Sequence, residues 1–508
     1  LNIIAMIQPE MTTIAGTLKV PRMINGLWQL AGGHDQDIDI AKASETMDPL
    51  IKAGLTAFDM ADHYGDAELV VGHHNTTSEL PLTAFTKWCP PENGITTFEN
   101  AEKAVDLALT RMGQTQIALL QYHAWDYSDD TFIHNLTHLQ AMQKQGKIAH
   151  IGLTNTDAAH LKLLLDSGFP IASNQVPCSV IDRRVVRGRL NQLCLETNTD
   201  LICYGTLLGG FLTEKWLGQP EPSDIKELNW ALRKYLRFIW AAGGWAPYQG
   251  VLRALDTVAR KHSVPISAVA TRHVLDIPAV KCVIVGTRLG ANSEKYIESN
   301  LEAFSFALDD EDRKVIAAAQ EQLSDLPGDC GDEYRRAPYL TASGDLSDHL
   351  VETDQLRQVY HAISNGQRVE YCSGSKWEPI AGYCRAVRIG NSIHISGTTA
   401  NPPVESLTHM GGSSAGSQTV RILDIIENAL KALGSSMKDV VRTRLLVETL
   451  DDCEQVSRAH GLRFGLEGIL PANTLVSAHI VGENMLVEIE TWAEVGSGKQ
   501  GVLKIKKA

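Results

Sequence analysis

The chain has 508 residues, of which 44% are hydrophobic and 21% charged, and its formal net charge at pH 7 is −14. This composition excludes a natively disordered chain, and the length exceeds the roughly 300 residues that one core usually serves, so we expect two domains. The acidic balance repels polyanions and excludes nucleic acid as the main partner.

Cysteine usage and hydropathy indicate the compartment. The nine cysteines are scattered and include no Cys-x-x-Cys pair, as expected of free thiols in a reducing environment. No apolar run approaches the ~20 residues that a membrane helix needs. The sequence thus predicts a cytoplasmic protein without a membrane partner.

Over the first three fifths of the chain, short apolar runs of β type alternate with stretches of helical periodicity, such as ENAEKAVDLALTRMG (99–113). The runs predicted as strands are 23–30, 56–61, 82–88, 117–125, 148–155, 171–178, 201–207 and 280–287. Eight strands alternating with eight helices form a (β/α)8 TIM barrel of the α/β class, which we expect over residues 12–325.

One insertion, residues 213–250, interrupts this alternation. It contains four of the nine tryptophans, namely Trp216, Trp230, Trp240 and Trp245. Two interpretations stay open: a helical excursion that packs on the barrel, or a lid over the substrate mouth.

After the barrel the pattern changes twice. Residues 326–378 are rich in Gly, Asp, Ser and Pro with one helical stretch, and we expect a linker region there. Residues 379–496 form a smaller α+β domain, in which helices cover one face of a sheet. Its expected elements are a hairpin at 385–397 turning at Gly390-Asn391, a helix at 417–434, a strand at 439–448, a helix at 451–466, and a final strand pair joined by 482–484.

Four polar residues, Asp59, Tyr64, Lys87 and His123, stand at the ends of the second, third and fourth predicted barrel strands. Each alone has a structural explanation, such as a turn cap, a solvated strand end or a core imidazole. Right-handed crossovers place every strand's C-terminal end on one face of the barrel, where catalytic groups gather. Their convergence on one face predicts an active site.

The motif DMADHYG, followed by Lys87 and His123, resembles the aldo-keto reductase family over residues 12–325. The resemblance implies an NAD(P)H-dependent oxidoreductase that reduces an aldehyde or ketone by hydride transfer, with Tyr64 as general acid. The chemistry agrees, because an ammonium beside a phenol lowers its pKa from about 10, and a carboxylate holds that ammonium in place. Lys87 and Asp59 would supply these groups, and His123 would hydrogen-bond the carbonyl oxygen.

The same resemblance implies a cofactor site. Four residues match those that bind the nicotinamide carboxamide or stack on its ring: Thr154, Asn155, Gln175 and Tyr204. Four more resemble the adenosine-phosphate segment: Gly286, Thr287, Arg288 and Asn300. A guanidinium suits a 2′-phosphate, so NADP(H) is expected rather than NAD(H). No metal site is expected, because His73-His74 lack further ligands at regular spacing.

Three tryptophans, Trp28, Trp88 and Trp125, fall where loops would line the pocket. As pocket walls they favour a bulky hydrophobic or secondary-metabolite carbonyl; as rim packing they say nothing of the substrate. An alternative of another class is a cofactor-bound sensor or scaffold with little turnover.

The second domain resembles the Rid family (YjgF, endoribonuclease L-PSP-like, of chorismate mutase-like fold) in GYCRAVRIGNSIHISGTTA, PANT and LVEIETWAEV. The resemblance implies trimers with a cleft between subunits, in which Glu490 is the water-binding glutamate and Tyr383 the cleft tyrosine. Asn473 stands where the deaminating members have arginine, and an amide lacks the charge and bidentate fork that bind a carboxylate.

Three interpretations of the second domain follow. It could assemble the chain as a homo-oligomer, bind an uncharged ligand, or hydrolyse an imine or enamine and so feed a carbonyl to the reductase in a bifunctional protein. The acidic charge argues against RNA cleavage.

Overall fold

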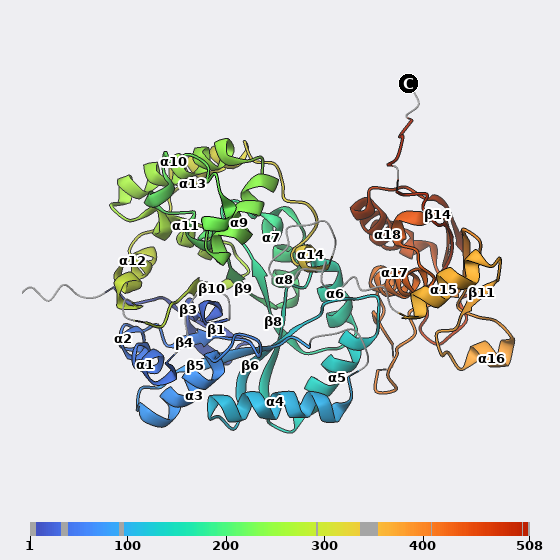
Figure 1. Ribbon diagram of the computed structural model, residues 1–508, viewed down its shortest axis with the longest axis horizontal. Coiled ribbons are helices and arrows are strands. Elements are labelled where there is room, and N and C mark those ends of the chain that lie inside the picture. Colours follow the sequence, from blue (N-terminus) through green and yellow to red (C-terminus); the bar gives the residue numbers. More distant parts are fainter. Residues whose placement is uncertain are drawn as a thin grey trace, which may run out of the picture.

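The computed structural model describes residues 7–31, 39–90, 96–290, 293–335, 354–407, 409–499 and 501–505. A large domain formed by the first two thirds of the chain lies beside a smaller one (Figure 1). Among the described residues, no helix is long and apolar enough to cross a membrane.

Eight parallel strands close the barrel in the order β10-β3-β4-β5-β6-β7-β8-β9. They are β3 (Met23–Gly26), β4 (Ala57–Asp59), β5 (Thr83–Trp88), β6 (Ile117–His123), β7 (Ile148–Thr154), β8 (Ile171–Pro177), β9 (Asp200–Tyr204) and β10 (Val280–Gly286). The predicted barrel is therefore confirmed. Inward side chains such as Phe85 and Leu119 fill it, and a hairpin of β1 (Met11–Ile14) and β2 (Leu18–Pro21) packs Ile14 against them.

Helices surround the barrel (Figure 1). They include α1 (Ile40–Glu45), α2 (Met47–Lys52), α3 (Ala67–Thr77), α4 (Phe98–Met112), α5 (Thr131–Lys144), α6 (Ala158–Asp166), α7 (Arg184–Arg187), α8 (Leu190–Thr197), α11 (Ile266–Leu275), α12 (Ile297–Leu301) and α13 (Asp310–Gln320). Their ends follow local chemistry. For example, Thr97 caps α4 by accepting from the Asn100 amide, and Gly113 ends it at φ +62°.

The tryptophan-rich insertion is a helical excursion packed on the barrel. It leads through short 3-10 turns into α9 (Trp230–Ala241) and α10 (Trp245–His262). Buried side chains of α9, including Leu236 and Phe238, form a second hydrophobic cluster with Leu252 and Leu255 of α10. The insertion also reaches the barrel mouth through α9.

The predicted linker 326–378 differs from the structure at both ends. Residues 326–335, which include α14 (Asp332–Arg335), pack on the barrel, where Arg184 Nη1 lies 2.6 Å from Glu333 Oε2 and both side chains are buried. At the other end, β11 (Val369–Tyr371) pairs with the sheet of the second domain and follows α15 (Asp354–Ser364). The polar composition predicts a linker region, whereas ion pairs fix its first residues on the barrel and strand pairing fixes its last residues in the second domain.

The second domain has one six-stranded sheet in the order β11-β12-β13-β16-β14-β15. Its other strands are β12 (Ala386–Ile389), β13 (Ser392–Thr398), β14 (Val440–Val447), β15 (Ala472–Ser477) and β16 (Val487–Glu494), and its helices α16 (Trp377–Ala381), α17 (Ala415–Ala432) and α18 (Cys453–Glu467). The predicted hairpin is confirmed, with Gly390 at φ +58°.

The predicted final strand pair is wrong. β15 pairs in parallel with β14, whereas β16 lies between β13 and β14 and is antiparallel to both. Parallel strands need a crossover, and α18 supplies it between β14 and β15, which places β15 at the sheet edge. Neighbours in sequence are therefore separated by a strand in space.

The two domains meet where α17 packs against α6, as Figure 1 shows. Ser417 Oγ donates to Asp166 Oδ2 at 2.5 Å, and Asn428 Nδ2 donates to the Ser128 carbonyl at 2.9 Å. Further polar contacts, such as the ion pair between Arg421 and Asp130, border these. The interface is thus built from specific side-chain contacts.

Candidate active site

Three of the predicted catalytic residues meet at the C-terminal mouth of the barrel. Asp59 ends β4, and Lys87 lies near the end of the adjacent β5. Lys87 Nζ donates to Asp59 Oδ2 at 2.5 Å and to the Met60 carbonyl at 2.8 Å. The same nitrogen lies 4.9 Å from the centroid of the Tyr64 ring. The structure therefore brings the phenol, the ammonium and the carboxylate together.

The pKa of Tyr64 is raised well above its usual value, first by burial and then by the negative charge of Asp59. This direction is opposite to the one expected from a neighbouring lysine. Burial and the charge of the Asp59 carboxylate, which pairs with Lys87, outweigh any lowering effect of the ammonium. At neutral pH the phenol is protonated, which is the form that can donate a proton.

His123 ends β6, and burial followed by the charge of Arg335 lowers its pKa, so the ring is neutral. Its Nδ1 lies 3.3 Å from the Thr154 carbonyl. A carbonyl only accepts, so the proton of the neutral ring is assigned to Nδ1. Nε2 is buried without a hydrogen-bond partner among the described residues. In this tautomer it can accept a hydrogen bond from a hydroxyl but cannot donate one to a carbonyl oxygen, which differs from the role expected of His123.

Gln121 is a site residue that the sequence reasoning missed. Its Nε2 donates to Asp59 Oδ1 at 2.8 Å, and its Oε1 accepts from Gln175 Nε2 at 2.7 Å. Gln175 Nε2 also lies 2.8 Å from Asp59 Oδ1. Strand alternation was the available signal, because Gln121 stands two residues before His123 and so shares its inward face.

The residues predicted to hold the nicotinamide lie beside this network. Thr154 Oγ1 and the Asn155 amide both donate to the Gln175 carbonyl, at 3.2 and 2.8 Å. Asn155 has a left-handed backbone (φ +55°), and its Oδ1 accepts from the Tyr204 hydroxyl at 2.8 Å. The four predicted residues, three of them buried, therefore form one connected group at the ends of β7, β8 and β9.

The residues predicted to bind the adenosine phosphate follow β10. Gly286 ends the strand, and a Cβ added there would lie 2.2 Å from Gln29 Nε2, so a larger residue would displace the end of the Gln29 side chain. Thr287 is buried and its amide donates to the Gly26 carbonyl at 2.8 Å. Arg288 is exposed, and Asn300 lies on α12. The guanidinium of Arg288 is thus accessible to an anion.

Trp88 does not line the mouth. Its side chain is 6% exposed, and its ring packs 5.7 Å from that of Tyr122. Neighbours on a strand point to opposite faces, and Lys87 faces the barrel interior, so Trp88 faces the helix layer. This placement contradicts the predicted substrate role of Trp88.

Trp125 and Trp28 do lie at the mouth. The Trp125 ring is edge-on to His123, with centroids 4.2 Å apart. The Trp28 ring lies 5.5 Å from the Nζ atom of Lys234, a residue of α9 that the sequence did not single out. Lys234 is 7% exposed and no carboxylate among the described residues pairs with it. The aromatic rings around this ammonium compensate part of its burial.

Tyr334 of α14 completes the mouth. Its hydroxyl accepts from Lys234 Nζ at 2.9 Å and lies 3.2 Å from the Tyr204 hydroxyl. Its ring is edge-on to His123 at 5.5 Å. No pattern in the sequence marks Tyr334, because it follows the barrel in a stretch of linker-like composition.

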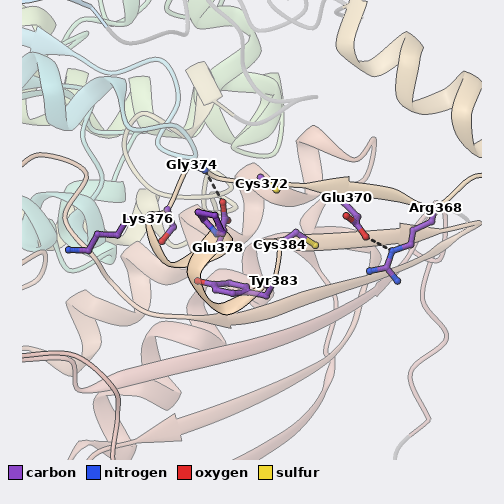
Figure 2. A pocket seen from close by; sticks show the side chains of 11 residues that line it. Arg368, Glu370, Cys372, Gly374, Lys376, Glu378, Tyr383 and Cys384 are labelled. Atoms are coloured by element: carbon purple, nitrogen blue, oxygen red, sulfur yellow. Dashed lines mark hydrogen bonds and ion pairs between the residues drawn. The ribbon is translucent and has the colours of Figure 1, made fainter.

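In the second domain, Tyr383 borders a cavity of about 500 Å³ (Figure 2). Glu378, Cys372 and Cys384 line the same cavity, and Glu378 Oε2 accepts from the Gly374 amide at 3.1 Å. This cavity lies beside β11 and β12, at one end of the sheet.

The three residues predicted to form the second domain's cleft do not meet within one chain. Glu490 on β16 pairs in register with Arg444, and Arg444 Nη1 lies 3.5 Å from Glu490 Oε2. Asn473 belongs to the neighbouring row of residues paired across the strands, in which it lies opposite Thr443; its Nδ2 donates to this buried threonine at 2.9 Å. Alternate rows face opposite sides of a sheet, so Asn473 and Glu490 point away from each other. Tyr383 precedes β12, and three strands separate β12 from β15.

Two relatives and one solved structure place these domains among known proteins. Flagellar radial spoke protein 5 of Chlamydomonas reinhardtii is 33% identical over 133 residues, which make up 26% of this chain but only 25% of that protein. Aldo-keto reductase str7 of Strobilurus tenacellus is 26% identical over 56% of this chain and 82% of its own length. The glycerol dehydrogenase AKR11B4 from Gluconobacter oxydans has the barrel fold, with a TM-score of 0.51 and 20% identity over 63% of this chain and 97% of its own.

Family models match both domains. The model described as endoribonuclease L-PSP matches residues 373–495, which confirms the resemblance of the second domain to the Rid family. The aldo/keto reductase model matches residues 22–321, the segment that forms the barrel and its mouth. Since that match spans more than half of the chain, we conclude that the protein belongs to the aldo/keto reductase family.

Proposed function

We propose that the barrel is an NADP(H)-dependent oxidoreductase that reduces an aldehyde or ketone, with Tyr64 as the proton donor. The observation that supports this most directly is the position of Tyr64 at the mouth, where its ring centroid lies 4.9 Å from Nζ of Lys87, which is paired with Asp59. Family membership supports the reaction class.

Each residue has a defined task in this proposal. A bound reduced nicotinamide supplies the hydride, which goes to the carbonyl carbon. Tyr64 gives its proton to the carbonyl oxygen, the C=O double bond becomes a C–O single bond, and the phenolate regains a proton from water. Lys87, held by Asp59, stabilises the phenolate while it lasts. The reverse reaction, oxidation of an alcohol, uses the same groups, and Nε2 of His123 suits the alcohol hydroxyl.

The proposed cofactor site combines residues at the C-terminal ends of β7, β8 and β9 with residues that follow β10. Asn155, Thr154 and Gln175 offer polar groups to the carboxamide, and Tyr204 offers its ring to the nicotinamide. The exposed guanidinium of Arg288 suits a 2′-phosphate, which supports NADP(H) over NAD(H). We propose a bulky hydrophobic carbonyl as substrate because Trp28 and Trp125 remain at the mouth.

A panel of aldehydes, ketones and alcohols, followed at the nicotinamide absorbance with both cofactors, tests this function. Steady turnover of at least one pair, faster with the phosphorylated cofactor, is the expected result. Turnover by neither cofactor in either direction would contradict it.

A second candidate function is a cofactor sensor with little turnover. It is favoured by the side chains of Tyr334 and Lys234, which fill part of the barrel mouth. Tyr334 and Lys234 lie against Tyr204, where a nicotinamide would stack, so exchange of the cofactor is expected to need movement of α14 or α9. The rate separates the two functions. A cofactor that stays bound through a long chase with unlabelled NADP+ supports the sensor, and rapid exchange with steady turnover supports the reductase.

For the second domain we propose assembly of a homo-oligomer, a trimer by its resemblance. The dispersed positions of Tyr383, Asn473 and Glu490 support a role that needs a second copy to complete any cleft. Native mass spectrometry tests this, and a monomer would contradict it. Release of ammonia from a reactive imine would instead favour the bifunctional alternative.

A further inference from the structure

A buried ion pair joins the two domains at His160 of α6. Its Nδ1 lies 2.7 Å from Oδ2 of Asp157, the residue that caps the same helix. Its Nε2 lies 3.2 Å from Oδ1 of Asp424, on α17 of the second domain. The Asp424 side chain is 4% exposed and that of His160 is 8% exposed. The second domain therefore holds this imidazole with a buried carboxylate rather than a surface contact.

Tyr127 connects this ion pair to the segment at the barrel mouth. The Tyr127 and His160 rings stack with centroids 3.7 Å apart and 11° between their planes. The guanidinium carbon of Arg335 lies 4.3 Å from the Tyr127 centroid. Two groups this close cannot share one face of the ring, so Tyr127 is sandwiched between the imidazole and the guanidinium. Asp424, His160, Tyr127 and Arg335 are thus in continuous contact.

Arg335 in turn fixes two loops of the active site. Its Nε and Nη2 donate to the Ala124 carbonyl at 2.9 and 2.5 Å, and its Nη1 donates to the Asn155 carbonyl at 2.5 Å. Ala124 lies between His123 and Trp125, so one guanidinium holds the backbone beside the substrate residues and that beside the cofactor residues. The preceding residue is Tyr334, whose ring lies against His123 and Trp125.

We infer that docking of the second domain positions the substrate side of the barrel mouth, with Arg335 as the positioning residue and contact running from Asp424 through His160 and Tyr127. This inference rests on the proposed function. If the contact between Asp424 and His160 is weakened, the stacking of His160 on Tyr127 loosens. Arg335 and Tyr334 can then move, and the substrate pocket widens. The KM for the carbonyl is then expected to rise more than kcat changes.

The first test compares two substitutions in α17. Asp424→Asn keeps the shape of the side chain but removes the charge that holds His160. Ser417→Ala is the matched control, since it removes another interdomain hydrogen bond, the partly buried one to Asp166, which does not touch this series. With 4-nitrobenzaldehyde and NADPH, we expect a three- to tenfold higher KM in D424N and an unchanged KM in S417A. Equal KM values in the wild type and both variants would overturn the inference.

Amide hydrogen exchange gives a readout that does not depend on turnover. Faster exchange is expected at residues 122–127 and 329–335 in D424N but not in S417A. If the wild type reduces no carbonyl, the proposed function fails, whereas this exchange difference still tests the positioning. If the wild type turns over and exchange is the same in both variants, the inference fails and the proposed function stands.

A double substitution checks that the effect passes through Arg335. Arg335→Lys keeps the charge but cannot reach both carbonyls with a planar fork. D424N should raise KM further by less than twofold in the R335K background, because the contact series is already broken. If the fold-increase in KM of the double variant equals the product of the two single fold-increases, Asp424 acts by a route other than Arg335. Should D424N fail to fold, His160→Gln tests the same contact from the barrel side.

Discussion

Lys87 Nζ lies 2.5 Å from Asp59 Oδ2, with each side chain only 4% exposed. The pair lies against the Tyr64 ring, with Lys87 Nζ 4.9 Å from the ring centroid. Burial and then the charge of Asp59 raise the pKa of the phenol. The proton donor is therefore kept in its donating form until charge develops on the bound substrate.

Removing that carboxylate should reduce the upward shift in the pKa of Tyr64, while the contribution of burial remains. In Asp59→Asn the Lys87 charge is uncompensated, so the pKa of Tyr64 should fall relative to the wild type. The same change leaves a buried charge without its partner and should lower the free energy of unfolding by about 3–5 kcal/mol. Ultraviolet titration of D59N against the double variant D59N/Y64F isolates the Tyr64 phenolate. A pKa that stays where it is in the wild type contradicts this account.

Tyr64→Phe should separate binding from chemistry. Loss of the proton donor is expected to lower kcat for carbonyl reduction by about 10²- to 10⁴-fold. Binding of NADPH, measured by quenching of tryptophan fluorescence, should change little, since the phenol is not among the proposed cofactor residues. Retained turnover would assign the proton transfer to another group.

The interdomain ion pair predicts a pH dependence of stability. Burial opposes the charge of His160, but the carboxylates of Asp157 and Asp424 outweigh it and raise the pKa of the imidazole to about 9. At Asp157, burial raises the pKa, but the charge and hydrogen bonds of His160 outweigh it and lower the pKa, and Arg335 lowers it further. At Asp424, burial raises the pKa despite the charges of His160 and Arg421. A histidine pKa raised on folding adds stability that is complete below about 6.5 and is lost as pH rises through 9.

The expected size is on the order of 3 kcal/mol between pH 6 and pH 10. Chemical denaturation of the wild type and of His160→Gln at a series of pH values checks it. Lysines, tyrosines and cysteines also titrate in this range, so only the difference between the two proteins is interpreted. Parallel curves would show that His160 adds no pH-dependent stability.

Local sequence patterns predicted what depends on local structure. Asp59, Lys87 and His123 each end an apolar run, and parallel pairing brings such ends to one face whatever the rest of the chain does. Gln121 could also be predicted, from strand alternation. Tyr334 and Arg335 could not be predicted, because their contacts join segments more than 100 residues apart and the sequence around them resembles a linker.

Two errors concern strands. Trp88 is expected on a loop that lines the pocket, whereas it is the last residue of β5 and faces away from the barrel interior. β15 and β16 were paired because they are consecutive, although β14 lies between them. The face of Trp88 follows from alternation with Lys87 once the strand is known to extend to residue 88, whereas the partner of β16 depends on non-local pairing that a single sequence leaves undetermined.

Arg288→Gln should change the cofactor preference. A charge-assisted hydrogen bond to a phosphate is worth about 1.5–3 kcal/mol, so loss of the guanidinium should weaken NADPH binding about 10- to 100-fold and leave NADH binding nearly unchanged. The matched control is Arg253→Gln, which removes an exposed arginine of α10 and should alter the binding of neither cofactor. Titration of both cofactors by fluorescence, at low and high salt, measures the effect. If NADPH and NADH weaken equally, Arg288 contacts a part that both dinucleotides share, and the 2′-phosphate must be bound elsewhere.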